Sequence, residues 1–448
     1  MRRNVLIGIA LLVVAAAGVG VVAMSGRRSE WTTSSAEALA DFEKGLDARD
    51  KLYYDEARLY LAKAVELDPN FLSAKYFLWA SMESMKSDPK AAKLFDELKR
   101  ADLSKLTDRE RFLLQYALAA DGGKNAAAAE QQLAAYAAKH PDDPYALERQ
   151  AGFATARQDW PAAHRLLTRL SEVAPNRVMA YNQLGYLEMG QGRFGEAQKM
   201  FETYRYIAPD QANPHDSLGE LFILIGRYDE ARKELEAALA IKPDFCASYE
   251  HLVRLSYMAG RPDEAAQALA RAERIAPCAA SMGKGMRCLN ATWDPLFAGD
   301  WEGVWRAQQA SCPNLDEDPL EIWVTLKTGH RTEAEAVEKK AHERLAKMTP
   351  GDPNRPYVEA FVAHIEGARL LLGGEPGKAA ERFRFADQSL TYRELPMGLI
   401  KLVNRFVLAQ ALEASGARDE AATVLASARA VNSSFVDRLA ALMGPVGS

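Results

Sequence analysis

Four cysteines are the residues of this 448-residue chain that most clearly suggest chemistry, because all of them fall inside one window of 67 residues. They are Cys246, Cys278, Cys288 and Cys312. No two of them are separated by two residues and no histidine follows at ligand spacing, so we predict no metal site. An even number of cysteines in an exported chain instead predicts disulfides, with three possible connectivities. The alternative is four reduced cysteines packed between helices, which holds if the chain stays in the cytoplasm.

The remaining reactive side chains do not form the constellations that enzymes use. There is no nucleophile-elbow serine pattern, and no two histidines form a metalloprotease pair. The seven histidines stand singly at His140, His164, His215, His251, His330, His342 and His364. Two glycine-lysine segments, 283–285 and 377–379, lack the upstream glycine and the following Ser or Thr of a phosphate loop, and we predict that they are turns between helices. The sequence therefore predicts no catalytic residue and no cofactor, and an enzyme hidden in residues 280–350 is disfavoured.

Four tryptophans gather in a short segment of the chain, at Trp293, Trp301, Trp305 and Trp323. Such a cluster could be an aromatic contact surface for a partner protein or a carbohydrate. We expect that these rings mainly form the packed core of an irregular helical hairpin, because large aromatic residues are usually buried.

Charge excludes one class of partner. Four of the 56 basic residues and one of the 61 acidic residues lie in the first 30 positions, which leaves the rest of the chain with a net charge of about −8. Binding to phosphate backbones needs a basic surface, so we expect no nucleic-acid partner.

The amino-terminal segment differs from everything that follows it. Residues 5–24 form an uncharged apolar run of 20 residues with two arginines on each side. Twenty apolar residues span a bilayer and exceed the usual apolar stretch of a signal peptide, so we predict an uncleaved single-pass anchor in the inner membrane. The positive-inside rule places the rest of the chain in the periplasm or outside the cell. The alternative is cleavage after Ala23 and release into the periplasm.

The elements that carry these residues follow a fixed period. Five prolines are spaced by 34 residues, at Pro141, Pro175, Pro209, Pro243 and Pro277. A column of alanines has the same period, at Ala129, Ala163, Ala197, Ala231 and Ala265. A second column of small residues consists of Ala117, Ala151, Gly185, Gly219 and Val253. A constant period of this length predicts stacked helical hairpins, in which small residues let two helices approach closely.

The turns within these hairpins are also visible in the sequence. Gly192, Gly226 and Gly260 are each followed by arginine and then by an aromatic residue or proline. We predict that each glycine adopts the left-handed conformation that ends the first helix of its hairpin.

This pattern resembles the tetratricopeptide repeat, a family of 34-residue helix-turn-helix units, most closely between residues 110 and 279. The resemblance implies an all-α solenoid, a right-handed superhelix of about 11 hairpins. It divides the chain into an anchor or signal segment (1–30), amino-terminal hairpins (31–109), five regular units (110–279) and degenerate hairpins with a carboxyl-terminal cap (280–448). No segment shows the alternation of a strand, so we expect essentially no sheet.

The positions of the cysteines within the predicted hairpins favour some of the three possible connectivities over others. Cys246 opens one hairpin and Cys278 closes it, while Cys288 and Cys312 do the same for the next hairpin. Antiparallel helices bring such ends together, so we favour these two pairs, with a bond between Cys278 and Cys288 as the main competitor.

In the tetratricopeptide family the first helix of every unit lines a concave groove, which implies a peptide-binding surface here. Its predicted members are Glu148, Arg149, Asn182, Tyr186, Asp216, Glu220, Glu250 and Arg254. Carboxylates outnumber guanidinium groups among them, so we expect a protein or extended peptide segment of basic or mixed charge. The Lys and Asn clamp with which some family members hold a terminal carboxylate is not matched at these positions. The alternative is a solvated acidic face without a ligand.

These observations favour a non-catalytic, membrane-anchored scaffold or adaptor for protein interactions in a bacterial cell envelope. The alternative is a regulatory or sensory repeat subunit that acts on a membrane-bound kinase or cyclase. The sequence does not indicate an oligomeric state.

Overall fold

The computed structural model describes residues 30–82, 88–120, 125–312, 319–349, 351–352 and 354–444, and within these ranges it contains helices and no strand. The apolar run predicted as an anchor lies outside the described residues. Contacts divide the chain into two compact units, with the boundary between Pro141 and Asp142.

The first unit consists of three helical hairpins. Its helices are α2 (Ala36–Asp50), α3 (Tyr54–Leu67), α4 (Leu72–Ser81), α5 (Pro89–Arg100), α6 (Asp108–Ala120) and α7 (Ala126–Ala137). Its core contains a cluster of aromatic rings in which Trp31 and Phe77 pack edge to face, with Phe42 against both.

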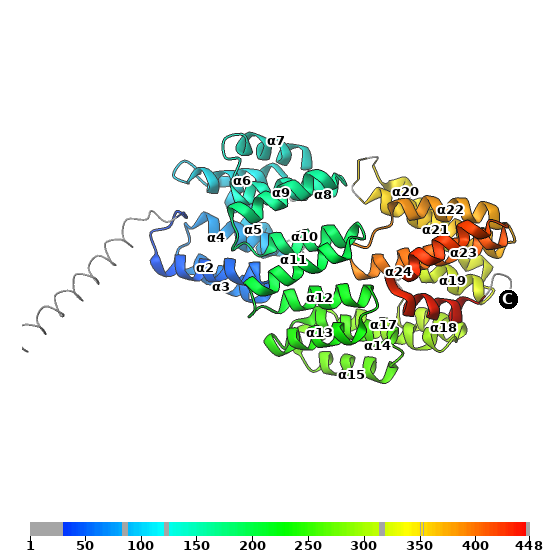
Figure 1. The fold of residues 1–448 in the computed structure, drawn as a ribbon. Helices are drawn as coiled ribbons and strands as arrows, with labels where there is room; N and C mark the ends of the chain where they lie inside the picture. The colour runs from blue at the N-terminus through cyan, green and yellow to red at the C-terminus, as the bar shows by residue number, and fades with distance from the viewer. Residues whose placement is uncertain are drawn as a thin grey trace, which may run out of the picture. The chain divides into compact units, whose positions relative to one another are not determined.

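The second unit continues the pattern with eight hairpins and one short extra helix (Figure 1). The regular part contains α8 (Pro144–Ala156), α9 (Trp160–Val173), α10 (Met179–Gly190), α11 (Phe194–Ile207), α12 (Ala212–Leu224), α13 (Tyr228–Ile241), α14 (Cys246–Met258) and α15 (Pro262–Glu273). The later part contains α16 (Ala276–Ser281), α17 (Gly283–Phe297), α18 (Trp301–Ser311), α19 (Pro319–Lys327), α20 (Arg331–Lys347), α21 (Arg355–Leu372), α22 (Pro376–Ser389), α23 (Leu395–Ala414) and α24 (Arg418–Met443).

Small residues hold the two helices of each regular hairpin together, as the sequence predicts. All five alanines of the repeated column are buried. A Cβ added to Gly219 would lie 2.6 Å from Leu235 Cδ2, and one added to Gly185 would overlap the ring of Phe201. Real Cβ atoms do not approach other atoms so closely, so these two positions require glycine for the helices to pack as they do.

The predicted turn glycines have the predicted conformation. Gly192, Gly226 and Gly260 have φ values of +75°, +77° and +75°, in the left-handed region that glycine enters without steric cost. In each case the second helix begins two residues later, at Phe194, Tyr228 or Pro262.

The later hairpins follow the expected order, with two local differences. Helix α16 was not predicted. The prediction that the two glycine-lysine segments are turns is wrong. Residues 283–285 open α17, and residues 377–379 lie in the first turn of α22. In α22 a proline at the helix start compensates for the nearby glycine, because its fixed φ suits the first helical position.

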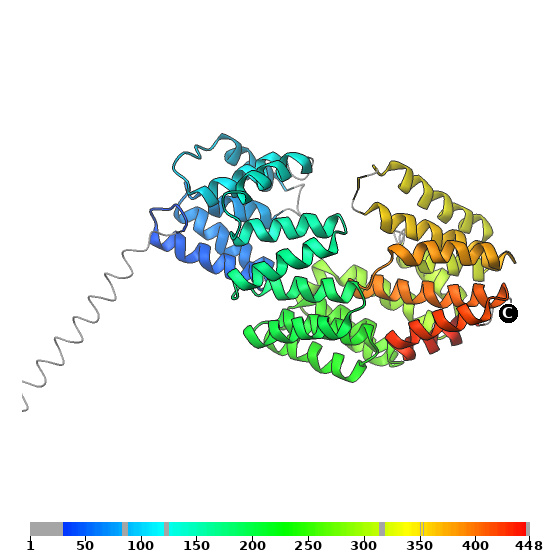
Figure 2. The ribbon, with the colours of Figure 1, turned by 45° about the horizontal axis from the view of Figure 1, so that its top comes forward.

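The carboxyl-terminal hairpin packs back onto the regular repeats, which the sequence pattern did not predict. Helix α23 contacts α12, and in Figures 1 and 2 the orange and red helices lie beside the ends of the green ones. Asn432 in α24 is buried and donates through Nδ2 to the carbonyls of Ile223 and Leu224, both at 3.1 Å. The side chains of α23 and α24 and those of α12 and α14 form one continuous hydrophobic core.

Among the described residues, one helix is long and apolar enough to span a membrane, namely α23, with a mean hydropathy of 1.3. Two-thirds of that window is buried inside the second unit. We therefore assign the apolar character of α23 to its place in the protein core.

Candidate functional site

The eight residues predicted to line a groove lie on α8, α10, α12 and α14, the first helices of the regular hairpins in the second unit. The structure separates them into two groups. The charged residues of α8 and α14 are partly exposed, whereas Asn182, Asp216 and Glu220 are buried and the half-buried Tyr186 is bonded to Glu220. Among the buried residues, Glu220 is bonded to Leu395 at the start of the carboxyl-terminal hairpin, so this part of the predicted groove is in contact with that hairpin.

The partly exposed group forms local ion pairs. Glu148 accepts from Arg177 at 3.1 Å, and Arg149 donates to the carbonyl of Tyr145. On α14, Arg254 donates to Glu250 Oε1 through both Nε and Nη2. Partly exposed ion pairs such as Glu148 with Arg177 and Glu250 with Arg254 contribute little to stability.

The buried group is a hydrogen-bonded network that joins α10, α12 and the start of α23. The Tyr186 hydroxyl donates to Glu220 Oε2 at 2.6 Å, and the backbone N–H of Leu395 donates to Glu220 Oε1 at 2.6 Å. Ser217 donates to Asn182 Oδ1 at 3.0 Å. Burial raises the pKa of the Glu220 carboxyl, against the lowering effect of the His251 charge and of these two donors. Glu220 thus holds the carboxyl-terminal hairpin against the repeats.

The same network contains one histidine whose role the sequence did not reveal. His251 Nδ1 lies 3.0 Å from Asp216 Oδ1, which also accepts from Ser248 at 2.7 Å. Burial alone would lower the pKa of His251, but the charge and hydrogen bond of Asp216 outweigh it and raise this pKa to about 9. The imidazolium is therefore the partner of a buried carboxylate. Because Asp216 and His251 lie 35 residues apart, close to one repeat, a comparison of adjacent units could have found the pair.

Two cavities adjoin this network on the inner side of the second unit. The first has a volume of about 620 Å³ and is lined by Tyr186, Asp216, Glu220 and His251, with residues 391–396 on its other side. The second has a volume of about 710 Å³ and a mainly apolar lining. Pro396, at the start of α23, borders both cavities.

Three of the four clustered tryptophans surround the second cavity. They are Trp293, Trp301 and Trp323. Trp323 is buried and its Nε1 donates to His364 Nε2 at 3.0 Å, while Trp305 stacks on His330. Trp323 thus has the core role that we expected, whereas Trp293 and Trp301 are half-buried in the wall of the cavity.

The cysteines lie next to this cavity. The structure pairs Cys246 with Cys278 and Cys288 with Cys312, the two pairs that the hairpins favour, and Cys288 is also part of the cavity wall. The first bond ties the start of α14 to α16, and the second ties α17 to the end of α18.

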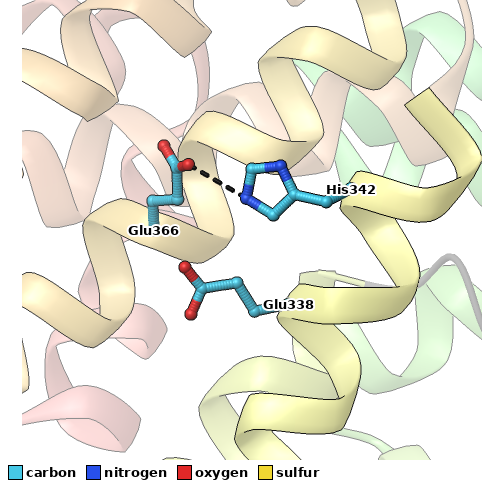
Figure 3. Close-up of side chains that lie close together, drawn as sticks. All are labelled: Glu338, His342 and Glu366. Atoms are coloured by element: carbon cyan, nitrogen blue, oxygen red, sulfur yellow. Dashed lines mark ion pairs between the residues drawn. The ribbon is translucent and has the colours of Figure 1, made fainter. Parts of the chain in front are cut away.

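One group of side chains has the composition of a metal site, although the sequence predicted none. Glu338 and His342 on α20 face Glu366 on α21, with ligand atoms within 4.8 Å of one another (Figure 3). However, Arg369 donates to Glu338 at 2.8 Å and Arg382 pairs with Glu366, while His342 Nε2 lies 3.1 Å from Glu366. Two guanidinium groups already neutralise the two carboxylates, so the group is an ion-pair network that joins α20, α21 and α22.

Comparison with known proteins supports the repeat architecture. Residues 222–280 match the family model of the tetratricopeptide repeat, and no curated protein matches the sequence. Similar solved structures include pilF of Pseudomonas aeruginosa, with 17% identity, a TM-score of 0.30 and coverage of 54% of this chain and 92% of that one. PilW, a type IV pilus biogenesis factor, has 15% identity, a TM-score of 0.39 and coverage of 46% and 93%.

A tetratricopeptide repeat protein from Parabacteroides merdae ATCC 43184 has 14% identity, a TM-score of 0.41 and coverage of 60% and 98%. These three similarities carry no functional argument. The family match itself falls on α12 to α16, where the turn glycines and buried alanines are most regular. The second unit is therefore built from α-helical hairpins, and residues 222–280 within it match the tetratricopeptide repeat.

Proposed function

We propose that this protein is a non-catalytic adaptor that is anchored in a bacterial cell-envelope membrane and holds partner proteins there. Tetratricopeptide repeats support a role in protein interaction in general. The finer proposal rests on the charged side chains that remain partly exposed on the first helices of the repeats, namely Glu148, Arg149, Glu250 and Arg254. Their weak internal pairs can be exchanged for pairs with a basic or mixed-charge segment of a partner.

The compartment is inferred from the cysteines and from the amino-terminal run. Both cysteine pairs are disulfides, and such bonds persist in oxidising compartments such as the periplasm. A 20-residue apolar segment with flanking arginines has the length of a membrane anchor. An exported domain held at the membrane by one helix is consistent with both features.

A crosslinking pull-down of the full-length protein from native envelopes tests the proposal. The double variant Glu148→Lys and Glu250→Lys reverses charge on both exposed parts of the surface, and we expect it to lose most of the captured partner. Asp216 is not used, because its reversal would break the buried pair with His251 and confound binding with folding. The matched control is Glu333→Lys with Glu335→Lys, the same charge change on the exposed face of α20.

Several outcomes would contradict the proposal. Equal capture by the double variant and its control would show that these first helices are not the docking surface. Recovery of the protein in the soluble fraction of the cytoplasm would remove the envelope role. If the protein specifically captures a membrane-bound kinase or cyclase whose activity changes on binding, its function is that of a regulatory subunit and not of an adaptor.

A further inference from the structure

The tryptophan-lined cavity of the second unit has a size and lining that suit a small ligand, and binding of partner proteins does not account for it. We propose that it binds an anionic amphiphile with a single alkyl chain, the chain in the cavity and a carboxylate head near Arg254. This site shares Glu250 and Arg254 with the charged surface of the adaptor proposal, whereas Glu148 and Arg149 belong to that surface alone.

Volume and lining favour an apolar ligand. At about 30 Å³ for each water, a volume of about 710 Å³ corresponds to roughly two dozen molecules of water. Most of the wall is apolar, so such water would lack hydrogen-bond partners on most sides. The size falls within the range of about 300 to 1,000 Å³ that is typical of ligand sites with apolar walls and a few polar groups.

The side chains of the wall favour a flexible chain over one rigid shape. Met282, Met286 and Met443 contribute unbranched thioether side chains, which adapt to irregular ligands. Leu289 on α17 and Val403 on α23 contribute aliphatic surface from two different helices. The Cys288–Cys312 disulfide fixes α17 to α18, so part of the wall is held in place while the methionines adjust.

The charged groups around the cavity favour an anionic head. Arg254 lies over the ring of Trp293 at 5.5 Å, and Arg438 lies over the ring of Phe297 at 5.9 Å. Both rings belong to the cavity wall, and Lys327 donates to the carbonyl of Met443, another wall residue. Glu250 is the acidic residue among the lining side chains. Arg254 is the basic residue of the lining, and Arg438 and Lys327 add positive charge beside the wall residues Phe297 and Met443.

Arg254 has the capacity to bind such a head. Guanidinium carries five N–H donors, and the bonds to Glu250 use two nitrogens of the group. A carboxylate is a strong acceptor for the remaining donors, because both groups are charged. The ion pair with Glu250 keeps the Arg254 side chain at the cavity before a ligand arrives.

Photolabelling of the full-length protein in its native membrane tests this site. The probe is dodecanoate with a diazirine at the end of its alkyl chain, followed by mass-spectrometric mapping of labelled peptides. We expect labels on α17 and α23, competed by unlabelled dodecanoate. Val403→Trp and, from another wall, Leu289→Trp fill the cavity and should each reduce this labelling about tenfold or more.

The controls separate binding from folding and from general membrane exposure. Leu59→Trp creates the same side chain at an exposed position of α3 and should leave the labelling unchanged. Arg254→Gln should weaken labelling by dodecanoate about tenfold, as expected for the loss of a charge-assisted bond, but not labelling by the matching alcohol. Circular dichroism and thermal unfolding check that each variant is folded.

The amphiphile site would be overturned if all labels fell on residues 5–24. It would also be overturned if both tryptophan variants kept the labels on α17 and α23. Equal loss with the acid and the alcohol for Arg254→Gln would overturn the role of the head group. Absence of labelling together with successful capture of a partner that carries an apolar segment would assign the cavity to a protein ligand. The adaptor proposal would survive that result, so the two proposals fail separately.

Discussion

At the scale of single residues, the hairpins depend on glycines and alanines that leave room for a neighbouring helix. Gly185 and Gly219 lie at the same place in consecutive repeats, and each faces a large apolar side chain of the second helix. Gly152, one position beyond Ala151 of the same column, faces nothing within 4 Å. Identical substitutions at these glycines should therefore have opposite effects on stability.

Gly185→Ala should lower the free energy of unfolding by about 1 to 3 kcal/mol, because the new methyl group overlaps the ring of Phe201 and forces the helices apart. Gly152→Ala should raise it by about 0.5 to 1 kcal/mol, since alanine restricts the unfolded chain and meets open space. Chemical denaturation of both variants measures the difference. Equal stabilities would show that the helices do not approach as described.

His251 predicts a dependence of stability on pH. Its pKa of about 9 in the folded protein lies above the usual 6.5, so the stabilisation is complete below about pH 6.5 and disappears as pH rises through about 9. The loss amounts to about 3 kcal/mol at most. Thermal unfolding between pH 7 and 10 should show a falling midpoint, and His251→Gln should flatten that slope.

The control for this experiment is His140→Gln, whose histidine is partly exposed and lies 3.9 Å from Asp108 in the first unit. Exposed pairs contribute little, so this variant should keep the slope of the natural protein. An unchanged slope in His251→Gln would mean that the Asp216 pair does not contribute to folding stability.

At the scale of elements, two disulfides tie short or irregular helices to their neighbours. Helix α16 has six residues and is too short to be stable alone, yet its Cys278 is buried and bonded to Cys246 at the start of α14. The bond between Cys288 and Cys312 spans 24 residues and closes the hairpin of α17 and α18. These bonds stabilise the part of the second unit where the repeat pattern weakens.

Thiol labelling tests both bonds. The purified protein should react at no cysteine before reduction and at four after reduction and unfolding. Cys288→Ser with Cys312→Ser should lower the free energy of unfolding by about 2 to 4 kcal/mol, because the unfolded chain loses a constraint. Free thiols at all four positions in protein from native membranes would contradict both the bonds and the export of this domain.

At the scale of the whole second unit, the carboxyl-terminal hairpin closes the array onto its own middle. Asn432 interrupts the helical geometry of α24, with φ −152° and ψ 90°, and bonds to the last carbonyls of α12. Its Oδ1 also accepts from the backbone N–H of Phe435 and from the hydroxyl of Tyr228. The closure buries Glu220 of the predicted groove and contributes part of the wall of both cavities.

Asn432→Ala should lower the free energy of unfolding by about 2 to 4 kcal/mol, because several buried groups lose their partners at once. Hydrogen exchange should increase in α24 and at the end of α12. Ser433→Ala, at the exposed neighbouring position, is the control and should change neither. Normal protection of α24 in Asn432→Ala would mean that the hairpin is held by its apolar contacts alone.

The hairpins, their left-handed turn glycines and the favoured cysteine pairs could be predicted from the sequence, because these features depend on residues close together in the chain. A glycine at Gly226 or an alanine at Ala231 acts within one repeat, so a constant period is enough to reveal it. The groove was predicted less well for the same reason. Residue types placed Asp216 and Glu220 on the first helix of a repeat, but could not show that Glu220 would bond to a distant part of the chain.

The return of α23 and α24 to α12 depends on long-range packing and is visible in the folded structure alone. The contact joins residues about 200 positions apart, such as Asn432 with Ile223, and it depends on the angle at which each hairpin stacks on the last. Small differences in packing accumulate over many hairpins, so the place where the chain returns cannot be read from any local pattern. That return turns acidic groove residues into buried anchors and creates the tryptophan-lined cavity.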